Sequence, residues 1–435
     1  MSTIIDGMRE DALAAFHAAV AAVQPARLIP AAVTVGGNGV SVRGEALPEV
    51  TGRRVVVALG KAAPGLAEAW LELLPEWADD VLVLTPHGVP VSDRVAQGGE
   101  VLRGAHPSPD EQGEASCRRM LALATTLGEE DLLLVLLSGG ASALLAAPRP
   151  GLSLEDIRAT TTALLSSGAT IHQLNAVRRQ LLEAAGGGLG RAAAPAQVVT
   201  LVLSDVLGDL IPDIASGPTV PSPTTAADAL GVLGGLGVVG DLPRSVVDVL
   251  RASVETTDDV SWAERCRIYL LANNRTAVDA AAAALAVRGY DAIVHPGFLE
   301  GEARERGALL ARFAEAFSSS RPAAFVAGGE TTVTVRGAGS GGRNHELALA
   351  AALELSGRQP VVILAAGTDG IDGSTDAAGA VVDPGTVARA RAAGVDLAAS
   401  LAGNDSGPAL AATGDAIHTG PTGTNVCDLV LLLSG

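Results

Sequence analysis

The chain has 435 residues, a formal net charge of −18 at pH 7 and only three cysteines. This length allows two or three domains, and an apolar fraction of 48% allows a large core, which must be aliphatic because 2% of the residues are aromatic. The acidic balance argues against nucleic acid as a partner, since phosphate backbones require basic patches, although a local positive pocket can still bind a small anion. The cysteines lie far apart at Cys117, Cys266 and Cys427, so neither a disulfide framework nor a zinc site is predicted.

The N-terminal residues 1–11 contain no basic segment followed by an apolar core, which a secretory signal would show. No uninterrupted apolar run reaches the length that a membrane span requires. From these two observations we expect a cytoplasmic protein with no membrane partner.

The first half of the chain alternates short apolar runs with helical patterns, beginning with an amphipathic helix over residues 7–24. Continuous apolar runs that end in glycine or polar residues are typical of buried parallel strands. The expected strands and helices of this half span residues 55–59, 62–74, 80–85, 111–127, 131–137, 153–166 and 198–203. The alternation predicts an α/β domain with a mostly parallel sheet, whose ligands bind at the carboxyl ends of the strands.

Residues 217–245 are rich in Gly, Pro and Thr and indicate a domain boundary or a long crossover. A second α/β region follows, with a helix that we expect to be capped at Thr276. Its expected elements span residues 267–271, 276–288, 292–295, 303–317, 323–327, 361–365 and 429–433, with one further helix ending near residue 355. We therefore expect two domains, over residues 1–250 and 251–435.

The stretch from Val55 to Ala63 combines a buried strand, a tight Gly60–Lys61 turn and the start of a helix. A helix N-terminus presents free N–H groups and attracts anions, and a lysine adds a full positive charge there. Lys61 is also the only lysine in the chain. This setting favours an anion-binding role over the alternative that a single surface lysine has been retained by chance.

Two other strand ends carry similar signals. The run over residues 131–137 ends in Ser138-Gly-Gly-Ala-Ser142, and the run over 198–203 ends in Ser204 and Asp205. A charged Asp205 at the end of an apolar strand would be costly without a partner. Together with the Lys61 turn, these loops are expected to converge on one crevice. His106 follows on another loop, either as a catalytic group or as an ordinary hydrogen-bonded loop histidine.

The segment Gly337-Ala-Gly-Ser-Gly-Gly342 matches the spacing of a dinucleotide-binding loop. The match is weak, because the preceding strand carries threonine and no acidic residue ends the next strand at the usual distance. We interpret these glycines as allowing the backbone to approach a phosphate. Arg343, which follows at a helix start, has a planar fork that suits a phosphoryl group or a carboxylate, although a surface salt bridge is an equal alternative.

Carboxylates gather in one Gly- and Thr-rich turn, at Asp369, Asp372 and Asp376. Hard carboxylates near phosphates suit Mg²⁺, whereas ordinary turn chemistry also accounts for Asp in such a loop. Glu330 follows two glycines at a strand end, as Asp205 does in its own loop. Because no Walker A loop, GxSxG motif or Cys/His pair is present, the loop carboxylates with one lysine and one arginine fit phosphoryl transfer best.

At these residues the chain resembles the class II glycerate 2-kinases, which carry a C-terminal MOFRL domain. The resemblance implies an N-terminal Rossmann-like domain, a smaller C-terminal α/β domain and a cleft between them. It also implies ATP-dependent phosphorylation of D-glycerate at its 2-hydroxyl, with Mg²⁺. The matching motifs follow one another along nearly the whole chain: LGKAA (59–63), HPSPDEQG (106–113), LLSGGASALL (136–145), NAVR (175–178), LSDVLGD (203–209), IASGPT (214–219), GGETTVTVRGAGSGGRNHE (328–346), GTDGIDG (367–373), DAAGA (376–380) and GPTGTNVCDL (420–429).

The resemblance implies catalytic roles for Lys61, Arg343 and Asp205, and we place Mg²⁺ at Asp205 and Asp369. A homodimer is compatible with this picture. The expected partners are ATP and a small hydroxy acid. The remaining residues expected to bind substrate or nucleotide lie in the same motifs: Gly60, His106, Ser138, Gly139, Gly140, Ser142, Asn175, Arg178, Glu330, Gly341, Gly342, Asn344, Thr422 and Asn425.

One segment departs from the family's pattern. Gln173 replaces a glutamate, Gln180 a histidine, Leu182 a serine and Ala185 a lysine. Several polar groups are thus lost together, which leaves open a kinase of another small hydroxy acid. Two further alternatives are an NAD(P)-dependent hydroxypyruvate reductase, based on the glycine-rich segment, and a silent relative that only binds a phosphorylated metabolite.

Overall fold

The structure is a computed structural model that describes residues 2–37, 39–254, 259–317, 321–355 and 360–435. It divides into two compact units. Residues 28–271 form one unit, which we call the Lys61 unit, and residues 1–27 with 272–435 form the other, the Arg343 unit. This division differs from the predicted domains over 1–250 and 251–435 at two places. Residues 1–27 belong with the C-terminal part of the chain, and residues 251–271 belong with the Lys61 unit.

The Lys61 unit is built on a six-stranded sheet with the order β6-β5-β4-β7-β8-β9. Each neighbouring pair from β6 through β8 is parallel, as the continuous apolar runs predicted. The strand order reverses between β4 and β7, so their carboxyl ends flank the switch point where open α/β sheets bind ligands. The strands span Arg54–Leu59 (β4), Asp80–Pro86 (β5), Glu100–Gly104 (β6), Leu132–Ser138 (β7), Gln197–Leu203 (β8) and Cys266–Ala272 (β9).

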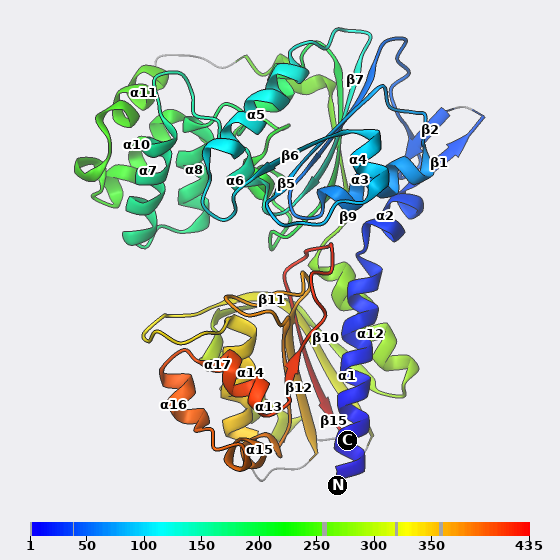
Figure 1. Ribbon diagram of the computed structural model, residues 1–435, viewed down its shortest axis with the longest axis vertical. Helices are drawn as coiled ribbons and strands as arrows, with labels where there is room; N and C mark the ends of the chain where they lie inside the picture. Colours follow the sequence, from blue (N-terminus) through cyan, green and yellow to red (C-terminus); the bar gives the residue numbers. More distant parts are fainter. Residues whose placement is uncertain (1, 38, 255–258, 318–320, 356–359) are drawn as a thin grey trace. The chain divides into compact units, whose positions relative to one another are not determined.

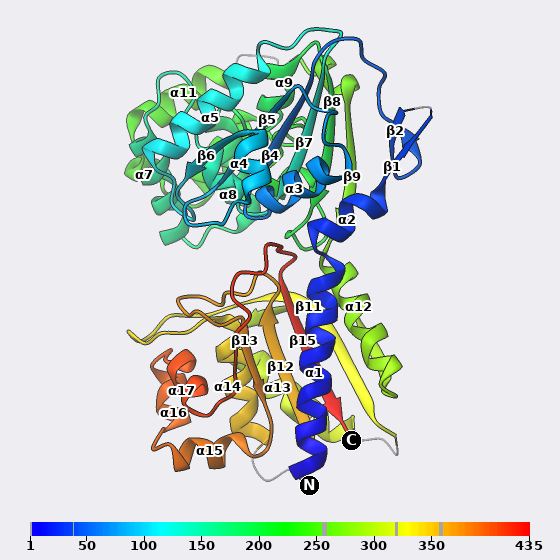
Figure 2. The same ribbon diagram turned by 45° about the vertical axis from the view of Figure 1, so that its right-hand side comes forward.

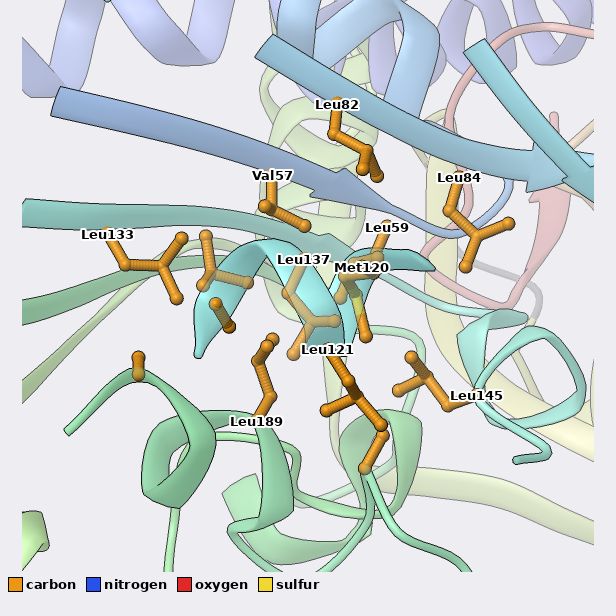
Figure 3. Packing of buried hydrophobic residues seen from close by; sticks show 14 of the residues in the cluster. Val57, Leu59, Leu82, Leu84, Met120, Leu121, Leu133, Leu137, Leu145 and Leu189 are labelled. Atoms are coloured by element: carbon orange, nitrogen blue, oxygen red, sulfur yellow. The ribbon is translucent and has the colours of Figure 1, made fainter. Parts of the chain in front are cut away.

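Short helices follow most of these strands and cover both faces of the sheet (Figures 1 and 2). Figure 3 shows Val57, Leu59, Leu82 and Leu84 of the sheet on the side that meets Met120 of α5. The core is aliphatic, as the composition predicted. The helices are α3 (Ala63–Leu73), α4 (Asp93–Gly98), α5 (Glu111–Ala124), α6 (Ala141–Leu144) and α9 (Gly188–Ala193).

A second core in the same unit lies among four helices: α7 (Leu154–Ser166), α8 (Ile171–Leu181), α10 (Ala226–Gly235) and α11 (Arg244–Val254). The prediction of a boundary or crossover over residues 217–245 is therefore wrong for its helical part. Thr225 caps α10 in a capping box with Asp228, a signal that the Gly- and Pro-rich composition obscured. Short 3₁₀ turns complete this region at η1 (Ile211–Ser216), η2 (Val239–Asp241) and η3 (Ser261–Arg265).

Helix α2 (Pro25–Ala32) leads into a small antiparallel sheet of β1 (Val33–Gly36), β2 (Gly39–Val42) and β3 (Glu45–Ala46). Side chains on both sides tie this sheet to β9. The Tyr269 hydroxyl donates to Glu45 at 2.9 Å, and the Arg43 guanidinium donates to the Leu271 carbonyl at 2.7 Å. The small sheet is therefore part of the Lys61 unit.

The Arg343 unit has a six-stranded mixed sheet with the order β10-β11-β15-β12-β13-β14. β15 is antiparallel to both of its neighbours, so the carboxyl ends of β11 and β12 lie at the same edge as the start of β15. The strands span Asp291–Glu302 (β10), Ala323–Thr332 (β11), Val361–Gly367 (β12), Gly379–Val382 (β13), Ala416–Ile417 (β14) and Asp428–Ser434 (β15).

Helix α1 (Ser2–Ala22) packs with α12 (Asn274–Val287) against one face of this sheet, while α13 (Ala303–Ala316) and α14 (Arg343–Leu355) cover the other (Figure 1). Three short helices complete the unit: α15 (Thr386–Ala392), α16 (Leu397–Ala402) and α17 (Ser406–Ala412). The cap of α12 is Asn273, with Thr276 as the third helical residue of its capping box, so the predicted cap at Thr276 was three residues late.

A buried ion-pair network explains why the N-terminal helix belongs to this unit. Arg9 of α1 contacts Asp383 at 2.6 Å and Asp415 at 2.9 Å, and Arg389 contacts the same two carboxylates. Both aspartates are almost fully buried, so losing either arginine would leave an uncompensated charge. Among the described residues no single helix is long and apolar enough to cross a membrane, although residues 3–22 and 25–32, bent by 49°, meet that criterion as a pair by length and composition.

Candidate functional site

The Lys61 turn requires glycine at its first position. Gly60 has φ +107°, and a Cβ there would lie 2.5 Å from the Ser138 carbonyl oxygen and 2.6 Å from that of Gly139. The Gly60 N–H donates to the Leu84 carbonyl at 3.0 Å, which binds the turn to β5. The close approach of β4 and β7 at the switch point thus depends on Gly60.

The start of α3 differs from the prediction of free N–H groups. The Lys61 N–H donates to the Gly139 carbonyl at 2.9 Å, and the Ala62 N–H donates to the Ser138 hydroxyl at 3.0 Å. Pro64 has no N–H to offer. The prediction that this helix start attracts anions through its amides is therefore wrong for these two groups, since the turn after β7 uses them.

Side chains from three further loops gather over the glycines after β7. A Cβ on Gly140 would lie 2.9 Å from Cγ of Lys61 and 3.4 Å from Nε2 of His106. A Cβ on Gly139 would lie 1.6 Å from Oδ2 of Asp205. The two glycines therefore leave the room that Lys61, His106 and Asp205 occupy, and the predicted convergence of these loops is confirmed.

The turn after β7 also presents unused backbone donors. Gly140 has φ +78° and begins α6 without a side-chain cap. Among the loop and cap hydrogen bonds of the described residues, none is donated by the N–H groups of Gly140, Ala141 or Ser142. The Ser216 hydroxyl donates to the Ser142 hydroxyl at 3.2 Å, and Ser216 has φ +60°. Successive free N–H groups on a glycine-rich turn form a concave anion-binding surface.

The loop that carries His106 is fixed by Asp110. Its carboxylate accepts hydrogen bonds from the N–H groups of Ala105 at 2.9 Å and Gly113 at 2.8 Å, and from Nε2 of His87 at 2.8 Å. Burial alone would raise the pKa of Asp110, but the bonds from His87 and the two amides outweigh it and lower the pKa. A charged Asp110 therefore caps α5 and positions the histidine loop.

Helix α8 carries the predicted residues Asn175 and Arg178. Asn175 donates to Asp213 at 3.2 Å, and Asp213 is also bound by the guanidinium of Arg179 and by Nδ1 of His172 at 2.9 Å. Asp213 is thus the residue that sequence reasoning missed here, although it lies directly before the IASGPT motif and between apolar residues. Asn175 serves this network, so its predicted contact with a ligand is not needed to explain its position.

Arg178 is different. Burial lowers the pKa of its guanidinium, and no carboxylate opposes that shift. Within the described residues its side chain has no hydrogen bond or ion pair. A largely desolvated cation without a counter-ion is costly, so Arg178 is a suitable anchor for an anionic ligand.

The four positions that depart from the family's pattern all have structural roles. Gln173 forms a capping box with Thr170 at the start of α8, and Gln180 donates to the Thr224 carbonyl at 2.7 Å. Leu182 and Ala185 are 2% and 1% exposed within the helical core. Each of the four side chains thus has a contact within the fold.

In the Arg343 unit, the candidate residues gather at the edge where β11 and β12 end and β15 begins. Arg343 binds Asp428 through Nε at 2.5 Å and Nη2 at 3.0 Å, and binds Glu330 through Nη1 at 2.8 Å. Burial raises the pKa of Asp428 to about 6, while Arg343 and Asn344 oppose the rise. Burial alone would lower the pKa of Arg343, but Asp428, Glu330 and Asp372 outweigh burial and raise it.

Asp372, for which Mg²⁺ binding and ordinary turn chemistry were the two alternatives, caps α14. Its oxygens accept from the N–H groups of Asn344 at 3.1 Å and His345 at 2.8 Å, and from Nδ1 of His345 at 2.6 Å. A Cβ on Gly342 would lie 2.3 Å from the Asp372 carboxyl carbon. The N-terminus of α14 is thus already occupied by an internal carboxylate, and the structural alternative holds for Asp372.

The glycine-rich segment before α14 packs against protein. A Cβ on Gly337 would lie 2.3 Å from the Gly403 carbonyl, one on Gly339 2.6 Å from Asp405, and one on Gly341 2.4 Å from the Ser406 hydroxyl. None of the three has a positive φ. Their lack of side chains is explained by the approach of the loop between α16 and α17, and a dinucleotide is not needed to explain it.

The remaining candidates lie beside the same sheet edge. The Thr422 hydroxyl donates to the Thr368 carbonyl at 2.6 Å, and its N–H donates to the Asp369 carbonyl at 3.1 Å. Asn425 accepts from the Cys427 N–H at 3.2 Å. Asp376 is exposed, with His418 at 3.7 Å. Within the described ranges no three His, Cys, Asp or Glu side chains form a group that could hold a metal ion by themselves.

Comparison with known proteins gives consistent results. Residues 11–251 match a family model described as a domain of unknown function, DUF4147, and residues 323–428 match the MOFRL family. The D-glycerate 2-kinase of Thermotoga maritima is 42% identical over 393 residues, which is 89% of this chain and 92% of that protein. A protein of Agrobacterium vitis, provisionally named hydroxypyruvate reductase, is 41% identical over 94% of this chain and 93% of its own length.

The crystal structure of the glycerate kinase of Thermotoga maritima is similar over 99% of this chain and 100% of that chain. Its TM-score is 0.84 and its sequence identity 38%. The expected α/β architecture with two units is therefore shared with a solved structure.

Proposed function

This chain belongs to the glycerate kinase family with a MOFRL domain, and from that premise we propose that it transfers the γ-phosphoryl group of ATP to the 2-hydroxyl of D-glycerate. The family membership makes the chain a phosphotransferase with an alcohol group as acceptor. The name of its Thermotoga maritima relative supports the 2-position.

One observation supports the proposal most strongly: the placement of Lys61 and Asp205 over the two glycines that follow β7. Phosphoryl transfer needs little covalent chemistry and much charge stabilisation. A lysine beside unused N–H groups at a sheet switch point provides positive electrostatic potential for phosphate oxygens. In this proposal the amides from Gly140 to Ser142 bind the phosphate oxygens, and Lys61 neutralises charge that develops on the transferred group.

Mg²⁺ fits the donor set of the Lys61 site. Mg²⁺ is usually held by one or two carboxylates together with substrate phosphates and water, so a group of three protein ligands is not required. Asp205 would be the carboxylate in the Lys61 unit, and the bound ion would supply positive charge that screens the phosphates. Asp369 stays a predicted ligand. The loop with His106 completes the surroundings of Lys61, and we propose that His106 contacts the substrate.

We propose Arg178 as the residue that binds the carboxylate of the acceptor. Its guanidinium is largely desolvated and lacks a counter-ion within the described chain, and a carboxylate matches its fork. Because Gln173, Gln180, Leu182 and Ala185 all serve the fold, D-glycerate is the acceptor that we favour. Arg343 stays the second proposed catalytic cation, acting on an anionic group of the substrate.

A hydroxypyruvate reductase is the second candidate, since a relative carries that name. The packing of Gly337 and Gly339 disfavours it. The side of each glycine where a Cβ would stand packs against Gly403 or Asp405, so a pyrophosphate has no room there. The test is the thermal midpoint of unfolding, measured with ATP and Mg²⁺ and separately with NADH. A rise of the thermal midpoint with ATP and Mg²⁺ but not with NADH supports the kinase. A rise with NADH but not with ATP would support the reductase in its place.

The reaction itself is tested by following ADP release with D-glycerate. Passing the product to enolase separates 2-phosphoglycerate, which enolase consumes, from the 3-isomer, which it does not. Turnover without an enolase signal would contradict the assignment of the 2-hydroxyl. The cytoplasmic location and a homodimer stay predictions of this proposal.

A further inference from the structure

Arg343 forms ion pairs with two carboxylates, those of Asp428 and Glu330. Two carboxylates share its guanidinium, and they differ sharply in exposure. The Asp428 side chain is 5% exposed and that of Glu330 is 45% exposed. The two ion pairs therefore have different strengths, because a buried charge-assisted pair persists whereas an exposed pair contributes little.

The position of Asp428 is fixed by the sheet and by hydrogen bonds to its backbone. It is the first residue of β15, opposite Gly329 on one side and Gly367 on the other. A Cβ on Gly367 would lie 3.4 Å from Oδ1 of Asp428, an ordinary contact distance, so the end of β12 packs directly beside the carboxylate. The backbone is fixed as well, because the buried Asn274 amide donates to the Asp428 carbonyl at 3.0 Å and to the Val426 carbonyl at 2.8 Å.

The geometry of Arg343 follows from this anchor. Asp428 takes Nε and Nη2, so one edge of the planar fork is fixed against the sheet. Nη1 is left at the opposite side, where it meets the partly exposed Glu330. Glu330 follows Gly329, the residue opposite Asp428, so both carboxylates come from the same level of two neighbouring strands.

We propose that Asp428 is the positioning residue of Arg343, and that Glu330 is an internal counter-anion on Nη1 which an anionic group of the substrate replaces. This inference rests on the proposed role of Arg343 in the kinase reaction. An arginine anchored on one edge is preorganised, so little conformational freedom is lost when the other edge binds substrate. Glu330 compensates the exposed part of the charge until then.

The test compares Asp428→Asn, Asp428→Glu, Glu330→Gln and Arg343→Ala in the full chain, by steady-state kinetics and thermal unfolding. Asp428→Asn keeps the shape of the side chain but loses its charge, and should lower kcat/KM by about 10- to 100-fold. Asp428→Glu should restore part of that loss, because the carboxylate returns with altered reach. Glu330→Gln should do the reverse and lower KM for the substrate by about two- to fivefold, as expected for the loss of a competing exposed ion pair.

A matched control separates positioning from stability. Asp383 is another buried carboxylate of the same unit that binds two arginines, Arg9 and Arg389. Asp383→Asn should lower the thermal midpoint as Asp428→Asn does, yet leave kcat/KM near that of the natural protein. A purely structural role for Asp428 would make the two variants alike in kinetics, which would overturn the inference.

The outcomes also separate this inference from the proposed function. If Arg343→Ala is severely impaired while Asp428→Asn keeps wild-type kcat/KM, Asp428 does not position Arg343, and only the inference is lost. If Glu330→Gln raises KM, then Glu330 binds substrate directly and is no placeholder. If Arg343→Ala itself keeps full activity, the proposed role of Arg343 and this inference both fail.

Discussion

Replacing Gly139 by alanine would test the arrangement at the end of β7 with a single carbon atom. A Cβ at this position would lie 1.6 Å from Oδ2 and 2.0 Å from Cγ of Asp205. Comfortable contacts between heavy atoms lie near 3.5 Å, so the carboxylate would have to move by roughly 2 Å. Displacements of about 1 Å in a catalytic group can cost about 100-fold in rate, so kcat/KM should fall by at least about that factor.

The assay is ADP release with D-glycerate and MgATP, after circular dichroism has shown that the variant is folded. The matched control is Gly128→Ala in the same unit, where the nearest atom to a new Cβ would be 3.9 Å away. That control should keep wild-type kinetics. Wild-type kcat/KM in a folded Gly139→Ala protein would refute the idea that the position of Asp205 matters for the reaction.

Three further predictions concern other residues. Arg343→Lys should be nearly as harmful to kcat/KM as Arg343→Ala, because lysine cannot bind Asp428 and a substrate anion with one planar fork; a fully active lysine variant would show that charge alone suffices. Ala215 has φ +51°, so Ala215→Gly should raise the free energy of unfolding by up to about 1 kcal/mol in urea titrations, and a loss of stability would show that the methyl contacts outweigh the strain. The pKa of Asp428 is raised from 3.8 to about 6, so between these pH values the folded state binds a proton that the unfolded state has lost. The stability that this proton contributes is present below about pH 4 and is lost as the pH rises through about 6. Asp428→Asn should flatten this dependence of the thermal midpoint on pH, and an unchanged dependence would assign it to another group.

The sequence predicted the Lys61 site better than it predicted the details of hydrogen bonding. A strand, Gly60, the single lysine and a helix were enough to place Lys61 at the sheet edge, because parallel strands share one carboxyl end. The hydrogen-bond partners of the Lys61 and Ala62 amides could not be predicted. These partners are the carbonyl of Gly139 and the hydroxyl of Ser138, about 77 residues later along the chain.

Long-range pairing also explains the other differences. The loop sequence around Asp372 allowed either Mg²⁺ binding or ordinary turn chemistry, but Asp372 caps a helix that begins 29 residues earlier in the chain, at Arg343. The glycines from Gly337 to Gly341 match the spacing of a phosphate loop. The residues that they contact lie at positions 403–406, which the local pattern does not include. Local patterns thus identified the special residues, whereas the tertiary partners decided which of them remain available for a ligand.

The most direct test of the account is the kcat/KM of purified, folded Lys61→Ala for D-glycerate with MgATP. The loss of an electrostatic stabiliser at the transferred phosphoryl group should lower this value by at least about 100-fold. Turnover at the wild-type rate would contradict the assignment of the Lys61 site as the place of phosphoryl transfer.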